Sequence, residues 1–345
     1  MNNLINLLEE QGITLNTAQN EVLSRSSKAT QVVPLIHQRV LSIHGPDTEK
    51  FLQGQLTCDV SEVFNRGSGL GAHCNIKGHM LSLFRLMKTQ QNGIWMRMHH
   101  SIFDSAAANL KKYMIFSKAE AEEVSANISG LGLLGPGAQA LVEKLFDRSP
   151  SEDNGALLLS NGIVVRVPGD RFEIWMDSEA LCELIKQLPD AVGIGATDDW
   201  LLSEIDAAIP DLRAETQEAF IPQMTNFQAL SGVSFKKGCY TGQEIVTRLQ
   251  HRGQLKKPMY IAEVESDTCP QAGQTISSPD KDNAGQVVFA APCEKSGERG
   301  ENRYRLLAVI VKNLAESAPL SLAGGAQLTL QPLPYTLDPK LFEPK

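Results

Sequence analysis

The pattern of apolar residues changes at Pro258, and this change limits the fold more than any other feature of the sequence. Before Pro258, stripes with helical spacing alternate with β-patterned runs such as 80–87 and 94–99, an order typical of α+β domains. After it, short β-patterned runs are separated by Gly, Pro, Asp and Asn, which indicates a small antiparallel barrel or sandwich. We therefore predict an α+β protein that ends in a small β-barrel.

The length of the chain, 345 residues, exceeds what one small core needs, so we expect two or three domains. Residues 1–31 are interpreted as a loosely attached N-terminal arm. They are largely polar, with a short helical stripe formed by Leu4, Ile5, Leu7 and Leu8. The first ordered domain is expected to open with strands at 32–36 and 39–43.

A glycine-rich segment at 130–137 has the composition of a phosphate-binding loop but not its spacing. It lacks the Gly-Lys-Ser/Thr ending of a P-loop, and its glycines miss the G-x-G-x-x-G pattern. We expect a strand here, followed by a turn into a helix over 138–146.

Composition argues against a general nucleic-acid coating protein, because the formal net charge is −8. A local exception runs from Lys236 to Lys257, where six basic residues meet one acid, Glu244. Such a cluster suits an anionic ligand or an RNA backbone, although a solvated helix face would also produce it. Four of its basic residues lie after Glu244: Arg248, Arg252, Lys256 and Lys257.

Targeting and metal signals are weak throughout the sequence. The N-terminus does not match a signal peptide, and no apolar run approaches the ~18 residues of a membrane span. The six cysteines are dispersed without a Cys-x-x-Cys pair, and the seven histidines form no HExxH motif. We expect a cytoplasmic protein with reduced thiols, no membrane segment and no built-in metal site.

Several signals converge on Cys239, which makes it the candidate reactive residue. Lys236 and Lys237 precede it, and an expected helix start follows it, so positive potential from both sources would favour the thiolate. Thr241 and Glu244 have the spacing of a capping box. The alternative interpretation is that Cys239 only packs in a glycine-flanked turn.

The stretch from Phe220 to Glu244 closely resembles the signature of the YgfZ family, a branch of the glycine-cleavage T-protein-like (aminomethyltransferase-like) proteins. Its core comprises Lys236, Lys237, Gly238, Cys239, Tyr240, Thr241, Gly242, Gln243 and Glu244. Further matches lie at 51–57 with Asp59, at 73–78, at 112–118 and at 332–335. The resemblance covers nearly the whole chain from about Val32 onward.

The resemblance implies three domains in a ring around a folate channel. We expect a folate-binding α+β domain at 32–118 plus 196–250, a second α+β domain at 119–195 and a barrel at 251–345. It also implies a folate-binding role in the upkeep of iron–sulfur enzymes, including those that methylthiolate tRNA. In such proteins the motif cysteine, here Cys239, is the reactive thiol, with Lys237 beside it.

Two residues are carried over from the resemblance as folate contacts. Trp200 matches a tryptophan that stacks on the pterin, although a core tryptophan is an equally good interpretation. Asp206 takes the place of a glutamate that accepts hydrogen bonds from the pterin. A second folate-contacting tryptophan of the family aligns near Gln38, which cannot stack in the same way. The expected cofactor is tetrahydrofolate or a derivative, bound more weakly or in a shifted pose.

The sequence departs from the aminomethyltransferase pattern at two positions that matter for the reaction. Aminomethyltransferases carry an acidic residue beside the folate, and the matching positions here are Ser82 and Leu83. Glycine-cleavage activity is therefore not expected. Two alternatives stay open: a folate-dependent one-carbon transferase or demethylase that acts on a small amine, and a pure folate-binding regulatory module. Direct tRNA contact would rest on the basic cluster alone.

Overall fold

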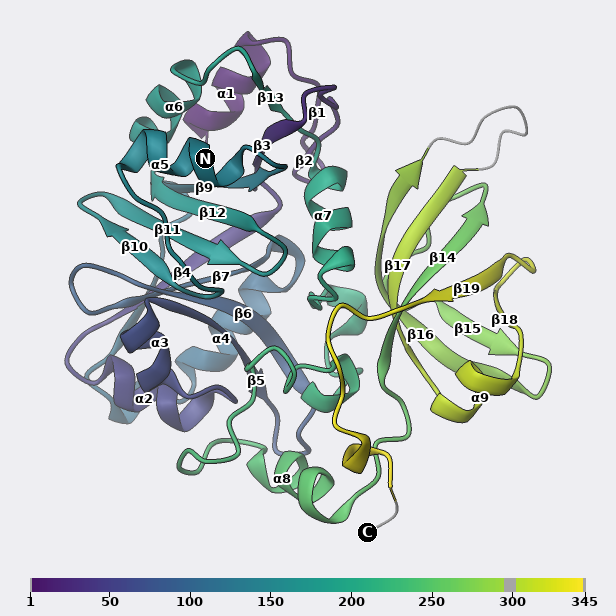
Figure 1. Cartoon of the computed structure of the whole chain (residues 1–345). Helices are drawn as coiled ribbons and strands as arrows, with labels where there is room; N and C mark the ends of the chain where they lie inside the picture. The colour runs from purple at the N-terminus through teal and green to yellow at the C-terminus, as the bar shows by residue number, and fades with distance from the viewer. Residues whose placement is uncertain (1, 295–301, 344–345) are drawn as a thin grey trace. The chain divides into compact units, whose positions relative to one another are not determined.

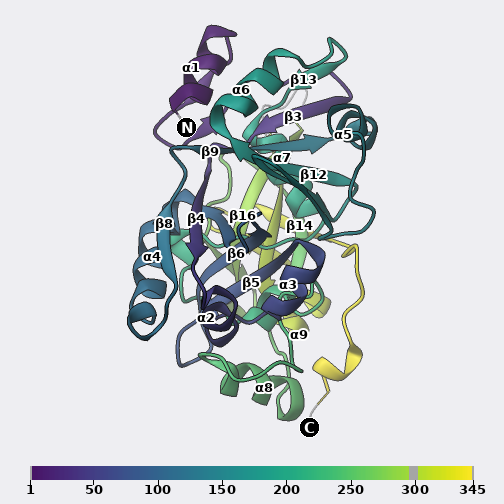
Figure 2. The same ribbon diagram turned by 90° about the vertical axis from the view of Figure 1, so that its left-hand side faces the viewer.

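The computed structural model describes residues 2–294 and 302–343, and the chain forms two compact units (Figures 1 and 2). The first unit contains residues 1–53, 59–70 and 84–200, and the second contains 54–58, 71–83 and 201–345. These limits cut across the domain boundaries expected from the sequence, which stay a prediction.

The first unit is built around two sheets. The strands of one sheet are, in spatial order, β10 (Ala156–Leu159), β11 (Gly162–Val167), β12 (Arg171–Asp177), β9 (Ile128–Leu134), β3 (Thr30–Pro34) and β13 (Val192–Ile194). Neighbours pair antiparallel except β3 and β13, which are parallel. The glycine-rich segment forms the end of β9 and the turn into α5 (Ala138–Phe146), so the predicted strand, turn and helix are confirmed.

The N-terminal segment is part of the core of this unit, and the expectation of a loosely attached arm is wrong. It forms helix α1 (Asn2–Glu10) and the short pair β1 (Leu15–Asn16) and β2 (Glu21–Val22). Helix α1 lies beside α6 (Ser178–Lys186) near one face of the sheet (Figure 1). Leu4 and Leu8 are 1 % and 0 % exposed because they share one apolar cluster with residues of α6 and β9.

The second sheet of this unit has the order β5 (Ser68–Cys74), β6 (Met80–Lys88), β7 (Ile94–His99), β4 (Gln38–His44) and β8 (Glu120–Glu123). Three helices lie between these strands in the sequence: α2 (Thr48–Gln55) and α3 (Val60–Arg66) between β4 and β5, and α4 (Phe103–Lys111) between β7 and β8. Strands β5 and β6 and helix α2 continue into the second unit. A buried ionic cluster joins the two sheets, because Arg85 of β6 and Arg97 of β7 both pair with Glu173 of β12.

The second unit contains a closed barrel, which confirms the prediction made from the pattern after Pro258. Its described strands are β14 (Met259–Ser266), β17 (Asn302–Ile310), β16 (Lys281–Glu294), β15 (Thr275–Ser278), β18 (Leu320–Leu322) and β19 (Gln327–Gln331). Alternate residues such as Ala262, Val264, Leu306 and Ala308 fill its interior. Helix α9 (Lys312–Ser317) follows β17 and lies at one end of the barrel (Figure 1).

Two further helices belong wholly or partly to the second unit. Helix α7 (Thr197–Asp206) enters it from the first unit, and α8 (Gln243–Arg252) follows the motif that contains Cys239. A long irregular segment separates them, interrupted by the short 3₁₀ turns η3 (Ala214–Thr216) and η4 (Pro222–Thr225). Within the described residues, no helix combines the length and apolar character needed to cross a bilayer.

Candidate functional site on the Cys239 loop

Among the described residues, which include all six cysteines, Cys239 is the one exposed cysteine. Cys58, Cys74 and Cys182 are buried, and the remaining two, Cys269 and Cys293, are partly buried. Cys239 lies in the loop that precedes α8, so its sulfur is open to reagents and to other molecules. The structure therefore shows that this thiol is accessible, and whether it reacts stays a prediction.

Lys237 ties this loop to the segment that follows α2. Its ammonium group donates hydrogen bonds to the backbone carbonyl oxygens of Leu56 at 2.8 Å and Cys58 at 2.7 Å. It also lies 5.2 Å from the ring centroid of Tyr240, within cation–π range. Lys237 therefore positions the loop, a task that the sequence did not suggest, whereas its predicted effect on the thiol is untested.

Hydrogen bonds within the loop also fix its conformation. The hydroxyl of Ser234 accepts hydrogen bonds from the backbone N–H groups of Lys236 and Lys237 at 3.4 and 3.3 Å. The side-chain amide of Gln243 donates to the carbonyl of Gly238 at 3.5 Å. Several residues of the motif thus shape the loop that carries the thiol, while Lys236 itself is exposed.

Gly242 lets the start of α8 approach the turn between β5 and β6. Its φ is +82°, and a Cβ there would collide with the carbonyl oxygen of Asn75. Gly78, with φ +76°, faces the same helix, because a Cβ on it would lie 3.0 Å from Cβ of Ile245. The positive φ favours glycine at both positions, and at Gly242 the lack of space requires it as well.

The predicted capping box is wrong. Gly242 is the N-cap of α8, and no side chain caps the helix. The hydroxyl of Thr241 lies 3.4 Å from the side-chain oxygen of Gln55, and its N–H donates to the carbonyl of Gly54 at 3.4 Å. Thr241 thus fastens the loop to the end of α2, and Glu244 is exposed in the first turn of α8.

Three titratable side chains of the same unit, those of His73, Cys74 and Tyr240, are buried. Burial raises the pKa of the Cys74 thiol to about 12 and lowers the pKa of His73 to about 4. Burial also raises the pKa of the Tyr240 phenol, and the nearby thiols Cys74 and Cys58 add to the effect. His73, Cys74 and Tyr240 are therefore uncharged near pH 7.

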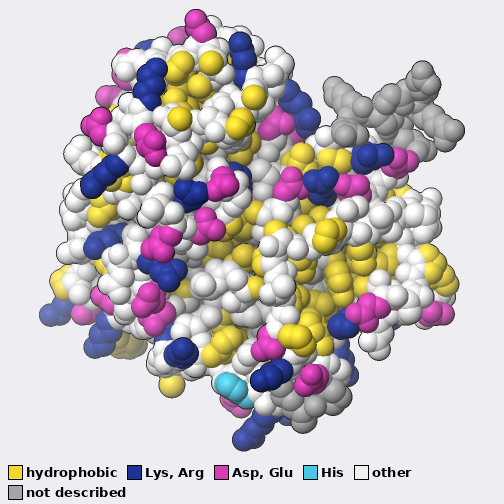
Figure 3. Space-filling view, in the orientation of Figure 1, with side chains coloured by type: hydrophobic (Ala, Val, Ile, Leu, Met, Phe, Trp, Pro, Cys, Tyr) yellow, Lys and Arg dark blue, Asp and Glu magenta, His cyan; other side chains and the backbone are white. Residues whose placement is uncertain are grey.

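The basic cluster follows the thiol along α8. Arg248, Arg252 and Lys256 are exposed, and Lys257 is half-buried. Figure 3 shows basic side chains and a histidine at the lower end of the molecule, over α8, with acidic side chains beside them. Lys257 also lines a small cavity of about 160 Å³, together with Phe220, Met224 and Gln286. Three of the four predicted basic residues can thus reach a polyanion from the surface.

Trp200 is a core residue in this structure. It is 1 % exposed, with the guanidinium of Arg171 placed 4.8 Å from its ring centroid. On another side it packs so closely against Gly132 that a Cβ at that position would collide with the indole. Of the two interpretations drawn from the sequence, the geometry supports packing, because the ring offers no open face for a pterin to stack on.

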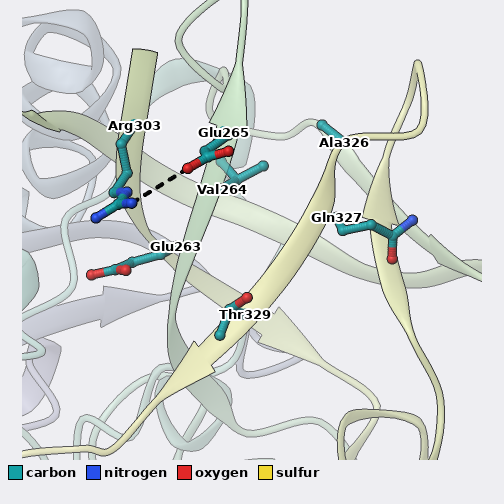
Figure 4. A pocket seen from close by; sticks show the side chains of 7 residues that line it. All are labelled: Glu263, Val264, Glu265, Arg303, Ala326, Gln327 and Thr329. Carbon is teal, nitrogen blue, oxygen red and sulfur yellow. Dashed lines mark hydrogen bonds and ion pairs between the residues drawn. The ribbon is translucent and has the colours of Figure 1, made fainter. Parts of the chain in front are cut away.

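Asp206 is half-exposed, but its carboxylate is paired with Arg305, which also binds Glu263 with Nη2 to Oε1 at 2.7 Å. Glu263 borders a hollow of about 570 Å³ at the barrel (Figure 4), where five of the seven lining side chains are polar and the other two are a valine and an alanine. Among these, Arg303 binds Glu265 at 3.4 Å. Such walls lack the aromatic or apolar surface that a pterin ring needs. The roles of Trp200 and Asp206 in folate binding stay predictions.

The positions that carry acids in aminomethyltransferases are buried in β6. Ser82 is 0 % and Leu83 is 2 % exposed. The Ser82 hydroxyl has no hydrogen-bond partner among the described residues. Neither residue can supply the carboxylate that aminomethyl transfer uses. Among the residues the structure describes, no group of His, Cys, Asp and Glu side chains is arranged to hold a metal ion.

Comparison with solved structures defines the class of fold. The aminomethyltransferase T of the glycine cleavage system from Bartonella henselae aligns with a TM-score of 0.66, covering 96 % of each chain at 14 % identity. The protein thus has the glycine-cleavage T-protein fold, as the sequence predicted. The predicted ring arrangement of its domains stays a prediction.

Comparison with curated sequences gives the family. The chain is 35 % identical over 312 residues to the "tRNA-modifying protein YgfZ" of Cronobacter sakazakii, covering 86 % of this chain and 90 % of that one. It is 32 % identical over 326 residues to the protein of the same name from Pectobacterium carotovorum, covering 93 % and 96 %. No protein-family model matches the chain. The chain belongs to the YgfZ family.

Proposed function

We propose that this protein is a cytoplasmic, folate-binding accessory protein of tRNA modification that supports iron–sulfur enzymes through the thiol of Cys239. Its relatives are named for tRNA modification, and its fold is that of a folate-dependent class of enzymes, as the resemblance stated above implies. The observation that carries the thiol part is the exposure of Cys239 alone among six cysteines.

The arrangement of the loop favours encounter with a large partner. An exposed sulfur on a loop fixed by Lys237, Ser234 and Gly242 can be reached by another protein, or by a group bound to one. The buried thiols Cys58 and Cys74 cannot be reached in this way. The reactivity of a cysteine depends on its solvent access and on the fraction present as thiolate. The structure supports the first of these conditions for Cys239.

We propose folate binding because of the fold and the family, and not because of the two residues named from the sequence. The indole of Trp200 is enclosed, and the carboxylate of Asp206 is paired with Arg305. We therefore assign no step of a reaction to folate. Titration of the full chain with tetrahydrofolate in a calorimeter tests this part by itself, and the absence of binding heat at any temperature would remove folate from the proposal.

The thiol is tested by replacing Cys239 with Ser in cells that lack the native gene. We expect the fraction of methylthiolated tRNA to fall to that of the empty-vector strain, with normal protein levels. Cys293→Ser is the matched control, because Cys293 is a partly buried cysteine of the barrel, and it should leave modification unchanged. If Cys239→Ser sustains full modification, the reactive-thiol proposal fails and a pure binding module becomes the better description.

A further inference from the structure

An unusual group of large apolar side chains is exposed in the turn after α4. Phe116 is 98 % exposed, Ile115 is 77 % exposed and Tyr113 is 45 % exposed. Single exposed apolar residues are normal on protein surfaces, whereas several together mark sites of interaction. Nothing in the site around Cys239 accounts for this cluster.

The backbone of this turn is well fixed. Residues Met114–Phe116 form a 3₁₀ turn, η2, whose Met114 is buried and whose carbonyl accepts the N–H of Ser117 at 2.8 Å. The next residue, Lys118, donates its N–H to the carboxylate of Asp47 at 2.8 Å. Tyr113 is the N-cap of this turn and precedes Phe116 by three residues, the spacing at which side chains of a 3₁₀ turn are nearly eclipsed.

The turn is also basic. Lys111, Lys112 and Lys118 are exposed, and the segment 111–118 contains no acidic residue. The ammonium of Lys112 lies 2.9 Å from the side-chain oxygen of Asn109, a neutral partner. The nearby acid Asp47 is engaged by the backbone N–H of Lys118. This local charge is opposite to the net charge of −8 carried by the whole chain.

We propose that this turn binds single-stranded RNA, with unpaired bases stacked on Phe116 and Tyr113 and with phosphates at the three lysines. Aromatic rings flanked by cationic side chains are the common means of binding unpaired nucleotides, because every base has a face that can stack. Unpaired bases of RNA occur in loops, such as those of tRNA. The proposal deepens the proposed function, on which it rests for the choice of tRNA as the source of the loop.

The test measures fluorescence anisotropy of a labelled oligouridylate and of an unmodified tRNA transcript with the full chain over a range of salt. The critical variant is Phe116→Leu, which keeps an apolar side chain but removes the ring. We expect it to weaken binding about 5- to 150-fold, whereas Phe116→Tyr should bind as the parent does. Replacing all three lysines by Gln should make the slope of log affinity against log salt shallower by about 2.

Leu23→Ser is the matched control, since Leu23 is 49 % exposed in the same unit and lies outside the turn. It should leave RNA affinity unchanged. The proposal is overturned if neither RNA binds saturably, or if Phe116→Leu binds like the parent. It is equally overturned if Phe116→Leu leaves RNA binding intact while reducing self-association or binding to anionic lipid vesicles. None of these outcomes affects the test of Cys239 by tRNA modification in cells, so the two proposals can fail separately.

Discussion

The ammonium of Lys237 lies 2.7 Å from the backbone carbonyl oxygen of Cys58. The lysine beside the exposed thiol is thus bound to the backbone of a segment that lies far away in the sequence. The hydrogen bonds of the Lys237 ammonium group hold the loop against residues 56–58.

We predict that Lys237→Met loosens the loop. Hydrogen bonds to charged groups contribute about 1.5–3 kcal/mol each, and partial solvent access lowers that figure, so we expect the free energy of unfolding to fall by about 1–3 kcal/mol. Urea denaturation followed by circular dichroism measures this change. Lys236→Met is the control, because Lys236 is exposed and only its backbone N–H is bonded in the loop. Equal stability of the two variants would contradict the fastening role.

Gly242→Ala should be strongly destabilising. The alanine would have to adopt φ of +82° and its Cβ would meet the carbonyl of Asn75, so a loss of about 1–3 kcal/mol is expected from the backbone alone. Gly238→Ala provides the comparison within the same motif, because a Cβ at Gly238 has no atom within 4 Å. Thermal unfolding of both variants decides the matter, and similar melting temperatures would show that α8 can move away from the turn.

Stability should depend on pH through His73. Burial lowers its pKa to about 4 in the folded protein, against 6.5 for an exposed histidine. Below pH 6.5 the unfolded chain binds a proton that the folded protein excludes until about pH 4, so the free energy of unfolding falls across this window by about 3 kcal/mol. Above pH 6.5 the group has no effect, because both states are neutral.

Urea midpoints of the parent protein and of His73→Gln, recorded across this pH window, measure the contribution. The variant should show a shallower dependence on pH. A parallel pH dependence of His73→Gln and the parent would mean that His73 is protonated without cost in the folded state.

Trp200 should contribute to stability more than to ligand binding. Truncation of a buried tryptophan typically costs about 3–5 kcal/mol, so Trp200→Ala is expected to unfold at much lower urea concentration. The milder Trp200→Phe keeps most of the packing against Gly132. Its affinity for tetrahydrofolate, measured by calorimetry, should equal that of the parent. A selective loss of folate binding in a stable Trp200→Phe protein would restore the stacking role inferred from the family.

The parts of the fold that the sequence predicted well are those with strong local patterns. The strand at 94–99 and the helix at 138–146 have the bounds that were expected, because alternation and helical spacing are clear there. The barrel was predicted from its repeated short strands. Helix α1 was placed outside the core although its leucines have helical spacing, since its partners in β9 and α6 lie far away in the sequence.

The sequence motif marks the candidate site but does not show how the loop is built. The motif pointed to Cys239 and to the start of a helix. The acceptors of Lys237 are backbone carbonyls, which have no signature in a sequence. The capping box failed because Gly242 can adopt a positive φ and takes the N-cap position. The exposure of Phe116 is likewise a property of the turn and not of its composition.

The packing of α1 beside α6 has a consequence for synthesis of the chain on the ribosome. The apolar face of α1 is made well before Leu181 and Ile185, which share its cluster and follow most of the first unit in the sequence. At roughly 5–20 residues per second, the leucines of α1 wait on the order of ten to forty seconds for these partners. During that interval the leucines of α1 lack the partners in α6 that help to bury them in the folded unit.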